Sequence, residues 1–268
     1  MQLYKNNGNG QFSTTATYRK ILNYYHRGDG EIYNYFGDGH FYFSFWDVDG
    51  DGDVDFVGGA KESGPQKRLI YFENEGYSDS QGYHIKLTDR TKKENNPFFG
   101  IGYAHGAPAA MDVDNDGDLD LIIGHQSSAE AKKEGGELVN TYTCGGHFLY
   151  FENTGSATNP IYTKVDGSIN PFLNLIHQYA NNGGRKGTSL TFVDLDGDGD
   201  KDAVVAGQSS GGHFGVRYYT NTNNPTTPQY ENVAPSRNWF AHIHQEMKDD
   251  NRQDNSLGRG FSFNRHGK

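Results

Sequence analysis

Three stretches of the chain place an aspartate at every second position. DVDGDGDVD at 47–55 returns as DVDNDGDLD at 112–120 and as DLDGDGDKD at 194–202. Five carboxylates within nine residues repel one another, and a hard cation among their oxygens relieves that repulsion. Calcium takes oxygen ligands of this kind, so the pattern predicts three calcium sites. Solvated acidic turns are the alternative, and the threefold recurrence at one spacing disfavours them.

Within each loop we expect side-chain oxygens from positions 1, 3, 5 and 9 and the main-chain oxygen of position 7 to surround the ion. In the first loop this leaves the side chain of Asp53 free, and the other loops follow the same scheme. The predicted metal-site residues are Asp47, Asp49, Asp51, Asp53, Asp55, Asp112, Asp114, Asp116, Asp118, Asp120, Asp194, Asp196, Asp198, Asp200 and Asp202. A turn glycine, assigned as Gly52, Gly117 and Gly197, takes a positive φ without steric cost.

The residues around each loop decide which kind of calcium loop it is. An EF-hand requires glutamate at position 12 and a helix on each side, but that position holds Gly58, Ile123 and Val205. Each loop is followed instead by a short apolar run that is typical of a buried strand. These runs are DFVGG at 55–59, DLIIG at 120–124 and DAVVAG at 202–207, and FYFSFW, GAPAAM and TSLTFV precede the loops. Each loop is therefore predicted to join two strands as a hairpin.

The loops, the strands after them, and the segments LIYFENEG at 69–76 and LYFENTG at 149–155 resemble the FG-GAP/VCBS repeats of integrin-type β-propellers. The resemblance covers nearly the whole chain. It implies four-stranded blades around a central axis, with calcium in the hairpin between the first two strands of a blade. It also implies roles in extracellular adhesion or carbohydrate binding. We therefore expect an all-β fold, a β-propeller of four-stranded antiparallel blades.

The repeats organise the chain as one propeller domain, 1–268, with three complete calcium-loop repeats and a fourth blade split between the termini. The expected boundaries are 1–38 for the end of the split blade and a connector, 39–106, 107–187 and 188–258 for the three repeats, and 259–268 for the start of the split blade. Part of a larger propeller is the alternative. In the first repeat, strands are expected at 40–46, 54–59 and 68–73, with an outer strand near 82–88.

The two ends of the chain carry the evidence for the split blade. Leu3-Tyr4 and Asn7 align with Leu149-Tyr150 and Asn153, which predicts a third strand followed by a hairpin turn at 7–10. FSFNRHGK at 261–268 aligns with the start of the third loop, but Asn264 and His266 stand where the other loops have carboxylates. This fourth loop is expected to bind calcium poorly or not at all.

Three segments make the repeats unequal in length: 129–143, 173–189 and 238–259. The first is a predicted turn between second and third strands, and the other two link blades. In an antiparallel blade, such connections lie on the face opposite the first-to-second turns, which here carry calcium. A protein or glycan ligand is therefore expected on the face away from the calcium loops.

Composition narrows the class of partner. The formal net charge is −10, and three calcium ions would bring it to −4, so much of the acidity belongs to the ion sites. No basic stripe exists to neutralise phosphates, so no nucleic-acid partner is expected. No apolar run is long enough to span a membrane, no signal peptide is present in this chain, and the single cysteine, Cys144, excludes an internal disulfide. An extracellular or cell-surface location, or another calcium-rich compartment, is expected from the calcium sites.

Catalytic motifs are absent from the sequence. It contains no G-x-S-x-G, no phosphate loop and no Cys–His pairing, and His242 and His244 have no third metal ligand in spacing. We therefore expect no enzyme, but a calcium-stabilised binding or adhesion module. The alternatives are a structural subunit of a larger complex and the non-catalytic propeller part of a polysaccharide-active enzyme.

Overall fold

The computed structural model describes residues 2–3, 6–8, 11–14, 18–19, 25–26, 32–33, 42–59, 69–79, 82–91, 96–101, 106–124, 128–134, 137–143, 148–175, 186–208, 214–222 and 228–233. Within these ranges the regular elements are strands, apart from two short 3-10 turns, η1 (Gly167–Ile169) and η2 (Pro171–Asn174). The predicted all-β class is confirmed. None of the described residues forms a helix long and apolar enough to cross a membrane.

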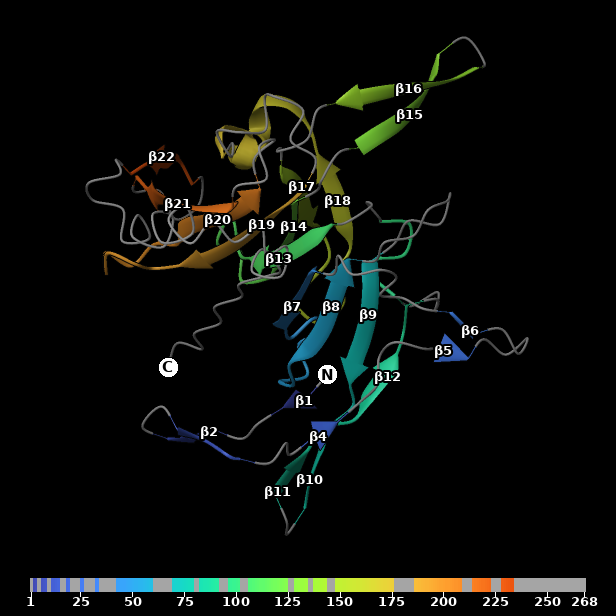
Figure 1. Ribbon diagram of the computed structural model, residues 1–268, viewed down its shortest axis with the longest axis vertical. Helices are drawn as coiled ribbons and strands as arrows, with labels where there is room; N and C mark the ends of the chain where they lie inside the picture. Colours follow the sequence, from blue (N-terminus) through green and yellow to red (C-terminus); the bar gives the residue numbers. More distant parts are fainter. Residues whose placement is uncertain are drawn as a thin grey trace.

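Three four-stranded antiparallel sheets form the centre of the molecule (Figure 1). The first contains β7 (Tyr42–Trp46), β8 (Asp55–Gly59), β9 (Leu69–Asn74) and β12 (Leu87–Asp89). The second contains β13 (Ala107–Met111), β14 (Asp120–Gly124), β17 (Phe148–Asn153) and β18 (Tyr162–Val165). The third contains β19 (Lys186–Val193), β20 (Asp202–Gln208), β21 (Phe214–Asn221) and β22 (Tyr230–Asn232).

The predicted hairpins are present, and their registers coincide. Trp46 pairs with Asp55, Met111 with Asp120, and Val193 with Asp202. Each acidic loop thus begins directly after the first strand of a sheet and ends on the first residue of the second. The identical register places the ninth aspartate of every loop inside the strand ladder.

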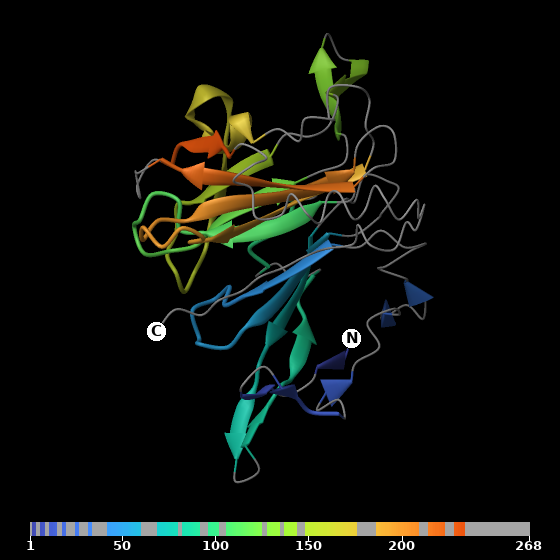
Figure 2. The ribbon, with the colours of Figure 1, turned by 60° about the vertical axis from the view of Figure 1, so that its left-hand side comes forward.

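The sheets pack face to face in chain order, with the second sheet between the other two (Figure 2). Alternate residues of a strand point to opposite faces, so each strand of the second sheet contributes to both interfaces. The core between the first two sheets contains Trp46, Val48, Val57, Leu69, Tyr71, Phe98, Leu121, Ile123 and Phe151. The core between the second and third contains Met111, Val113, Ile122, Phe148, Tyr150, Phe172, Leu175, Leu190, Ala203, Val205, Tyr219 and Tyr230. The first strand of the second sheet, β13, contacts both β7 and β19.

Two Asn-Pro-Phe turns, at 96–98 and 170–172, seal these interfaces. In both turns the asparagine Oδ1 accepts the N–H of the phenylalanine, at 2.9 Å. The phenylalanine side chains are fully buried, and each stacks on the first residue of the next sheet's outer strand. Phe98 stacks on Tyr162 with ring centroids 5.3 Å apart, and Phe172 stacks on Tyr230 at 5.8 Å.

The expected outer strand near 82–88 is present in two pieces. Gly82–His84 (β11) pairs with Tyr77–Asp79 (β10), whereas Leu87–Asp89 (β12) pairs with β9 and completes the sheet. Tyr77 pairs with His84 and Asn74 with Leu87, so both pieces continue one register, and Glu75 N–H donates to the Lys86 carbonyl between them. The hairpin extends past the edge of the four-stranded sheet, which is why only its base joins that sheet.

Segment 129–143 forms a hairpin of β15 (Ser128–Glu134) and β16 (Glu137–Thr143). It leaves the second sheet between the neighbouring strands β14 and β17, as the repeat lengths predicted, and projects away from the sheets (Figure 1). Because the acidic loop lies at the β13–β14 end of that sheet, this hairpin extends from the opposite end.

Near the N-terminus, the described residues form three short strand pairs. β1 (Gln2–Leu3) pairs with β4 (Tyr18–Arg19), β2 (Asn6–Gly8) with β3 (Gln11–Phe12), and β5 (Tyr25–His26) with β6 (Ile32–Tyr33). Of the hairpin turn expected at 7–10, residues 7 and 8 belong to β2, which pairs with β3. The predictions for Cys144, for 238–259 with His242 and His244, and for 261–268 with Asn264 and His266 lie outside the described residues.

Candidate metal centres

The ninth aspartate of each loop is the buried centre of a hydrogen-bond network. Its Oδ2 accepts the N–H of the loop's second residue, at 2.9 Å for Asp55, Asp120 and Asp202 alike. Its Oδ1 accepts the N–H of an asparagine in the third strand, at 2.7, 2.7 and 2.9 Å. Because both oxygens take main-chain donors from different elements, one carboxylate ties the loop to the second and third strands.

A tyrosine of the third strand adds a further donor to Oδ2 of the same carboxylate. Tyr71, Tyr150 and Tyr218 donate through their hydroxyls to Asp55, Asp120 and Asp202, at 3.4, 3.2 and 2.9 Å. The asparagines that follow three residues later are Asn74, Asn153 and Asn221. Each asparagine side chain in turn accepts a main-chain N–H at the start of the fourth strand, from Lys86, Ile161 and Gln229.

These tyrosines and asparagines were not predicted from the sequence, although their signal is visible in it. The third strands read YFEN at 71–74, YFEN at 150–153 and YYTN at 218–221, so a Tyr-x-x-Asn spacing accompanies every acidic loop. In a strand, residues three apart point to opposite faces. The asparagine therefore meets the aspartate through its main chain, while the tyrosine meets it through its side chain.

The first aspartate of each loop accepts main-chain N–H groups from residues later in the same loop. Asp47 accepts N–H groups of Gly50 and Gly52 at 2.7 and 2.9 Å, and Asp194 accepts those of Gly197 and Gly199 at 2.7 and 3.2 Å. This geometry corrects one assignment: the turn residue at position 6 of the third loop is Gly199, with φ 99°, and Gly197 stands at position 4.

Both of these positions take a left-handed conformation in all three loops. At position 6, Gly52 and Gly117 have φ of 93° and 98°. At position 4, Gly50, Asn115 and Gly197 have φ of 71°, 64° and 83°. Asparagine is the non-glycine residue that best tolerates this region, which explains the sequence DND in the second loop.

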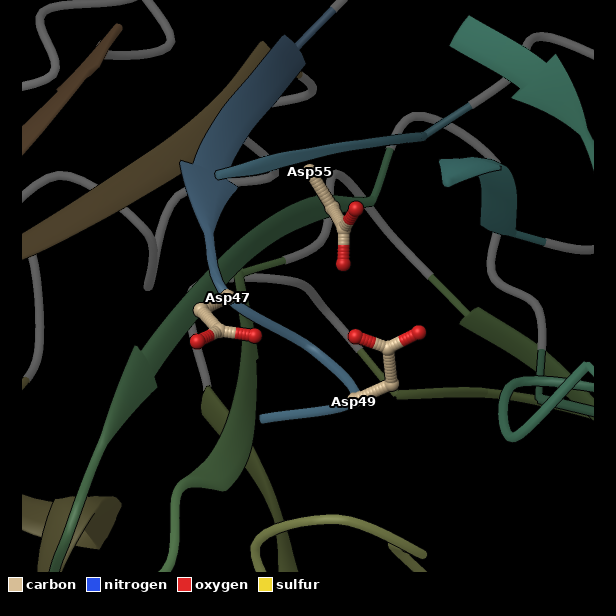
Figure 3. Close-up of side chains that lie close together, drawn as sticks. All are labelled: Asp47, Asp49 and Asp55. Atoms are coloured by element: carbon tan, nitrogen blue, oxygen red, sulfur yellow. The ribbon is translucent and has the colours of Figure 1, made fainter. Parts of the chain in front are cut away.

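Three carboxylates approach one another in each loop. In the first they belong to Asp47, Asp49 and Asp55, and Figure 3 shows them turned toward a common space. The corresponding groups are Asp112, Asp114 and Asp116 in the second loop and Asp194, Asp196 and Asp202 in the third, with one oxygen of each residue within 4.8 Å of the others. Asp51, Asp53, Asp118, Asp120, Asp198 and Asp200 complete the predicted set but lie outside these groups.

The seventh position differs from the prediction. Its side chain was expected to be free, but Asp118 and Asp200 are only 8% and 9% exposed. Only Asp53 keeps a half-buried side chain. The Asp118 Oδ1 has no hydrogen-bond partner among the described residues. The loops of the second and third sheets therefore hold an additional carboxylate beneath their surface.

Burial makes the ionised form of several of these carboxylates costly. It raises the pKa of both Asp55 and Asp120 to about 7, although main-chain N–H donors partly oppose this effect. Burial, followed by the neighbouring charge of Asp51, raises the pKa of Asp49. Burial and the charge of Asp116 do the same for the pKa of Asp118. A positive ion between these groups would offset both the burial and the mutual repulsion.

The residues present fit a hard metal ion. Calcium lies about 2.3–2.6 Å from its oxygen ligands, so two oxygens on one ion lie within about 5 Å of each other, as the grouped oxygens do. The Asp49 Oδ1 is buried and has no hydrogen-bond partner in the described part of the chain, which leaves it available as a ligand. Each loop could thus hold a metal ion through carboxylate oxygens.

No protein-family model matches the chain, and no curated protein matches it. The evidence for three related sites is therefore internal to the molecule: three loops with the same register, the same buried aspartate and the same tyrosine and asparagine partners.

Proposed function

We propose that the protein is a calcium-stabilised β-propeller that acts as a binding or adhesion module. The three sheets correspond to three blades. Face-to-face packing of successive sheets supports this, as does the contact of β13, the first strand of the second sheet, with both β7 and β19. In a propeller, the first strand of each blade lies nearest the axis.

The observation that carries the calcium assignment is the threefold recurrence of one carboxylate arrangement at one register. Chance acidity would not place Asp55, Asp120 and Asp202 at the same point of three ladders with the same donors. Loops with several carboxylates and no nitrogen or sulfur ligand favour calcium over zinc. Calcium supplies the positive charge that lets these carboxylates stay ionised when buried, and the loops contribute the oxygens that surround it.

The proposed partner surface lies at the end of the sheets away from the acidic loops. The β15–β16 hairpin supports this choice, because it projects from that end of the second sheet and contributes nothing to the four-stranded ladder. A rigid scaffold that presents an extended hairpin is suited to recognition. The ligand is a protein or a glycan, and the setting is extracellular or at the cell surface, where calcium is abundant enough to fill weak sites.

Calcium titration tests the first half of this proposal. Metal-stripped protein should bind three calcium ions per chain by calorimetry, and its Tm should rise with calcium. Each site filled at a hundredfold excess over its Kd adds about 2.7 kcal/mol to the free energy of unfolding. Asp49→Asn should remove one ion. A Tm that is the same in calcium and in chelator would refute the assignment.

Shortening the hairpin tests the second half. A variant with 129–142 replaced by a two-residue turn should keep its calcium content and Tm, because the four-stranded sheet remains complete. Its binding to a glycan array, or to a partner purified with the unmodified protein, should weaken at least tenfold. Equal binding by both proteins would exclude this hairpin from the partner surface.

A further inference from the structure

We propose that the second acidic loop is the tightest of the three calcium sites, because Glu152 adds a sixth carboxylate to it. Glu152 stands one residue before the asparagine of the Tyr-x-x-Asn motif, where the first sheet has Glu73 and the third has Thr220. The inference rests on the proposed calcium sites and adds the residues that set their relative affinities.

The third strand of each sheet brings this residue to the acidic-loop end. In the first sheet, β8 begins at the loop and pairs antiparallel with β9, so β9 runs back toward the loop. Residues two apart on a strand point to the same face. Glu73 therefore lies on the face of Tyr71, whose hydroxyl reaches Asp55, but two residues closer to the loop.

The second sheet repeats this geometry. The Asn153 N–H donates to the ninth aspartate of the second loop at 2.7 Å, the same distance as in the first sheet. The Tyr150 hydroxyl donates to that aspartate as well. Glu152 lies between these two residues of β17, so it stands beside the second loop as Glu73 stands beside the first.

This position faces the third aspartate of the loop. In the third sheet, the Thr220 hydroxyl donates to Asp196 Oδ2 at 3.3 Å. In the first sheet, Glu73 and Asp49 line the same cleft, and the charge of Glu73 acts after burial and Asp51 in raising the pKa of Asp49. An ionised glutamate cannot donate a hydrogen bond as threonine does, so two facing carboxylates require a cation nearby.

In the first sheet an arginine supplies such a cation. Arg90 Nε lies 2.6 Å from Glu73 Oε2, and the Arg90 N–H donates to the carbonyl opposite it on β9. The corresponding position in the second sheet holds Val165, which pairs with Tyr150. Glu152 therefore has no arginine at this position, and its negative charge acts on the ion in the loop.

A buried carboxylate in the second loop is independent evidence for a strong site there. Asp118 is 8% exposed, and its Oδ1 has no hydrogen-bond partner among the described residues. After burial, the charges of Asp116, Asp114 and Asp112 raise its pKa, so it lies among the carboxylates of the loop. The corresponding side chain of the first loop, Asp53, is only half-buried.

Formal charge ranks the three sites. Five aspartates and Glu152 give −6 for the second site, whereas five aspartates, Glu73 and Arg90 give −5 for the first. In the third, five aspartates and the exposed Lys201 give −4. The number of charges around a calcium ion tunes its Kd. The second site should therefore be the tightest and the third the weakest.

Competition with a chromophoric calcium chelator, on the metal-stripped full chain, tests this ranking. Glu152→Gln should still bind three ions, but its tightest Kd should weaken by at least about threefold. Thr220→Glu supplies the missing carboxylate to the third loop, so its weakest Kd should tighten by a similar factor. The control, Asp166→Asn, removes a charge from an exposed residue that follows β18 at the other end of the second sheet, and should change neither Kd. Circular dichroism of the calcium-loaded variants checks that each is folded.

Three bound ions with an unchanged tightest Kd in Glu152→Gln would overturn this inference and leave the calcium sites intact. An unchanged or weaker third site in Thr220→Glu would also overturn it, and this variant decides the question if Glu152→Gln does not fold. Equal weakening by Asp166→Asn would show an effect of overall charge and not of position. No calcium uptake by any form would instead refute the proposed calcium sites, and this ranking with them.

Discussion

At the scale of single residues, Asp55, Asp120 and Asp202 differ from the other loop aspartates in their role in the fold. Each accepts two main-chain N–H groups and a tyrosine hydroxyl, and each begins the second strand of its sheet. Removing such a carboxylate leaves buried donors without a partner, which costs more than the hydrogen bonds themselves contribute. The exposed aspartates in the middle of the loop, such as Asp51 and Asp116, accept only a local main-chain N–H two residues further on.

Two substitutions in the second loop should separate the role of a carboxylate in the fold from its role at the proposed metal site. Asp120→Ala leaves the N–H groups of Val113 and Asn153 unpaired, so the free energy of unfolding should fall by roughly 2–5 kcal/mol even without calcium. Asp116→Ala removes an exposed side chain that accepts the Asp118 N–H at 3.1 Å, so it should lower stability little in calcium-free buffer and much more when calcium is present. Urea unfolding in calcium-free and calcium-containing buffer measures both. Equal losses for the two variants in calcium-free buffer would contradict this division.

The raised pKa values of Asp55 and Asp120 predict an inverted pH response in the calcium-free protein. Their folded-state pKa of about 7 lies above the unfolded value near 4, so the folded state binds protons more tightly. Protonation therefore stabilises the fold below about pH 4, and this contribution is lost as the pH rises from about 4 to about 7. We expect the Tm of metal-stripped protein to fall across that window.

Calcium should oppose this fall in Tm with rising pH, because it binds the deprotonated carboxylates. The gain in Tm on adding calcium should therefore grow between about pH 5 and about pH 7. Asp120→Asn, which does not titrate, should flatten part of the calcium-free response. A calcium-free Tm that rises with pH across this window would show that these two carboxylates are ionised in the fold.

The three loops, and the three carboxylates that approach one another in each, could be predicted because aspartates at alternate positions, repeated three times, are hard to accommodate without a cation. Their partners could not, although Tyr71 and Asn74 stand in a motif that is repeated twice more. Tyrosine and asparagine are common in strands and turns, and nothing in their type alone shows which carboxylate they meet. The buried seventh position was also missed, since burial of Asp118 depends on neighbouring strands that the loop sequence does not describe.

At the scale of elements, the hairpin with its acidic loop is the unit that repeats, and its contacts with the next sheet distinguish one copy from another. In the first copy, Gly50 lies against the turn at 156–160 of the second sheet. In the third, no atom of the described residues lies within 4 Å of the position of a Cβ on Gly197. Among the described residues, the same loop thus contacts a neighbouring sheet in one copy and has no such contact at this position in another.

Gly50 and Gly52 are matched sites that test this contact. Gly52→Ala meets no atom of the described residues, so it should lose only the roughly 1–2 kcal/mol of a left-handed alanine. Gly50→Ala adds a methyl group 2.9 Å from the Ala157 carbonyl oxygen, and should lose at least about 1 kcal/mol more. Chemical denaturation gives both values. Equal losses would mean that the β17–β18 turn moves aside freely.

Strand positions were predicted to within one or two residues wherever an acidic loop marked one end. The first repeat's second strand was expected at 54–59 and spans Asp55–Gly59. Its outer strand has no such marker. Only the pairing of Tyr77–Asp79 with Gly82–His84 shows that these residues extend a hairpin past the sheet edge.

At the scale of the whole molecule, negative charge is concentrated rather than spread. The chain has 34 acidic and 24 basic residues, and the net charge of −10 is smaller than the number of carboxylates in the three loops. Repulsion between like charges lowers the stability of a compact state. Charge repulsion in the three acidic loops should therefore lower the stability of the calcium-free fold, but not that of the calcium-bound fold.

Salt should reveal this difference. Raising sodium chloride from about 0.02 M to about 0.5 M shortens the Debye length from roughly 20 Å to roughly 4 Å and screens the exposed loop carboxylates. We expect the Tm of metal-stripped protein to rise and that of calcium-saturated protein to change little. Differential scanning calorimetry on both forms measures this. Equal changes in Tm with salt for the two forms would show that the destabilising repulsion lies outside the acidic loops.

The position of Trp46 gives the molecule a built-in optical reporter. This side chain directly precedes the first acidic loop, is 7% exposed, and packs edge-on against Phe98 with ring centroids 6.0 Å apart. The chain contains one other tryptophan, Trp239. A Trp239→Phe variant would emit from Trp46 alone, so its fluorescence would follow the filling of the first loop separately from the other two. Compared with total calcium uptake, that signal would show whether the first loop loads before or after the other two.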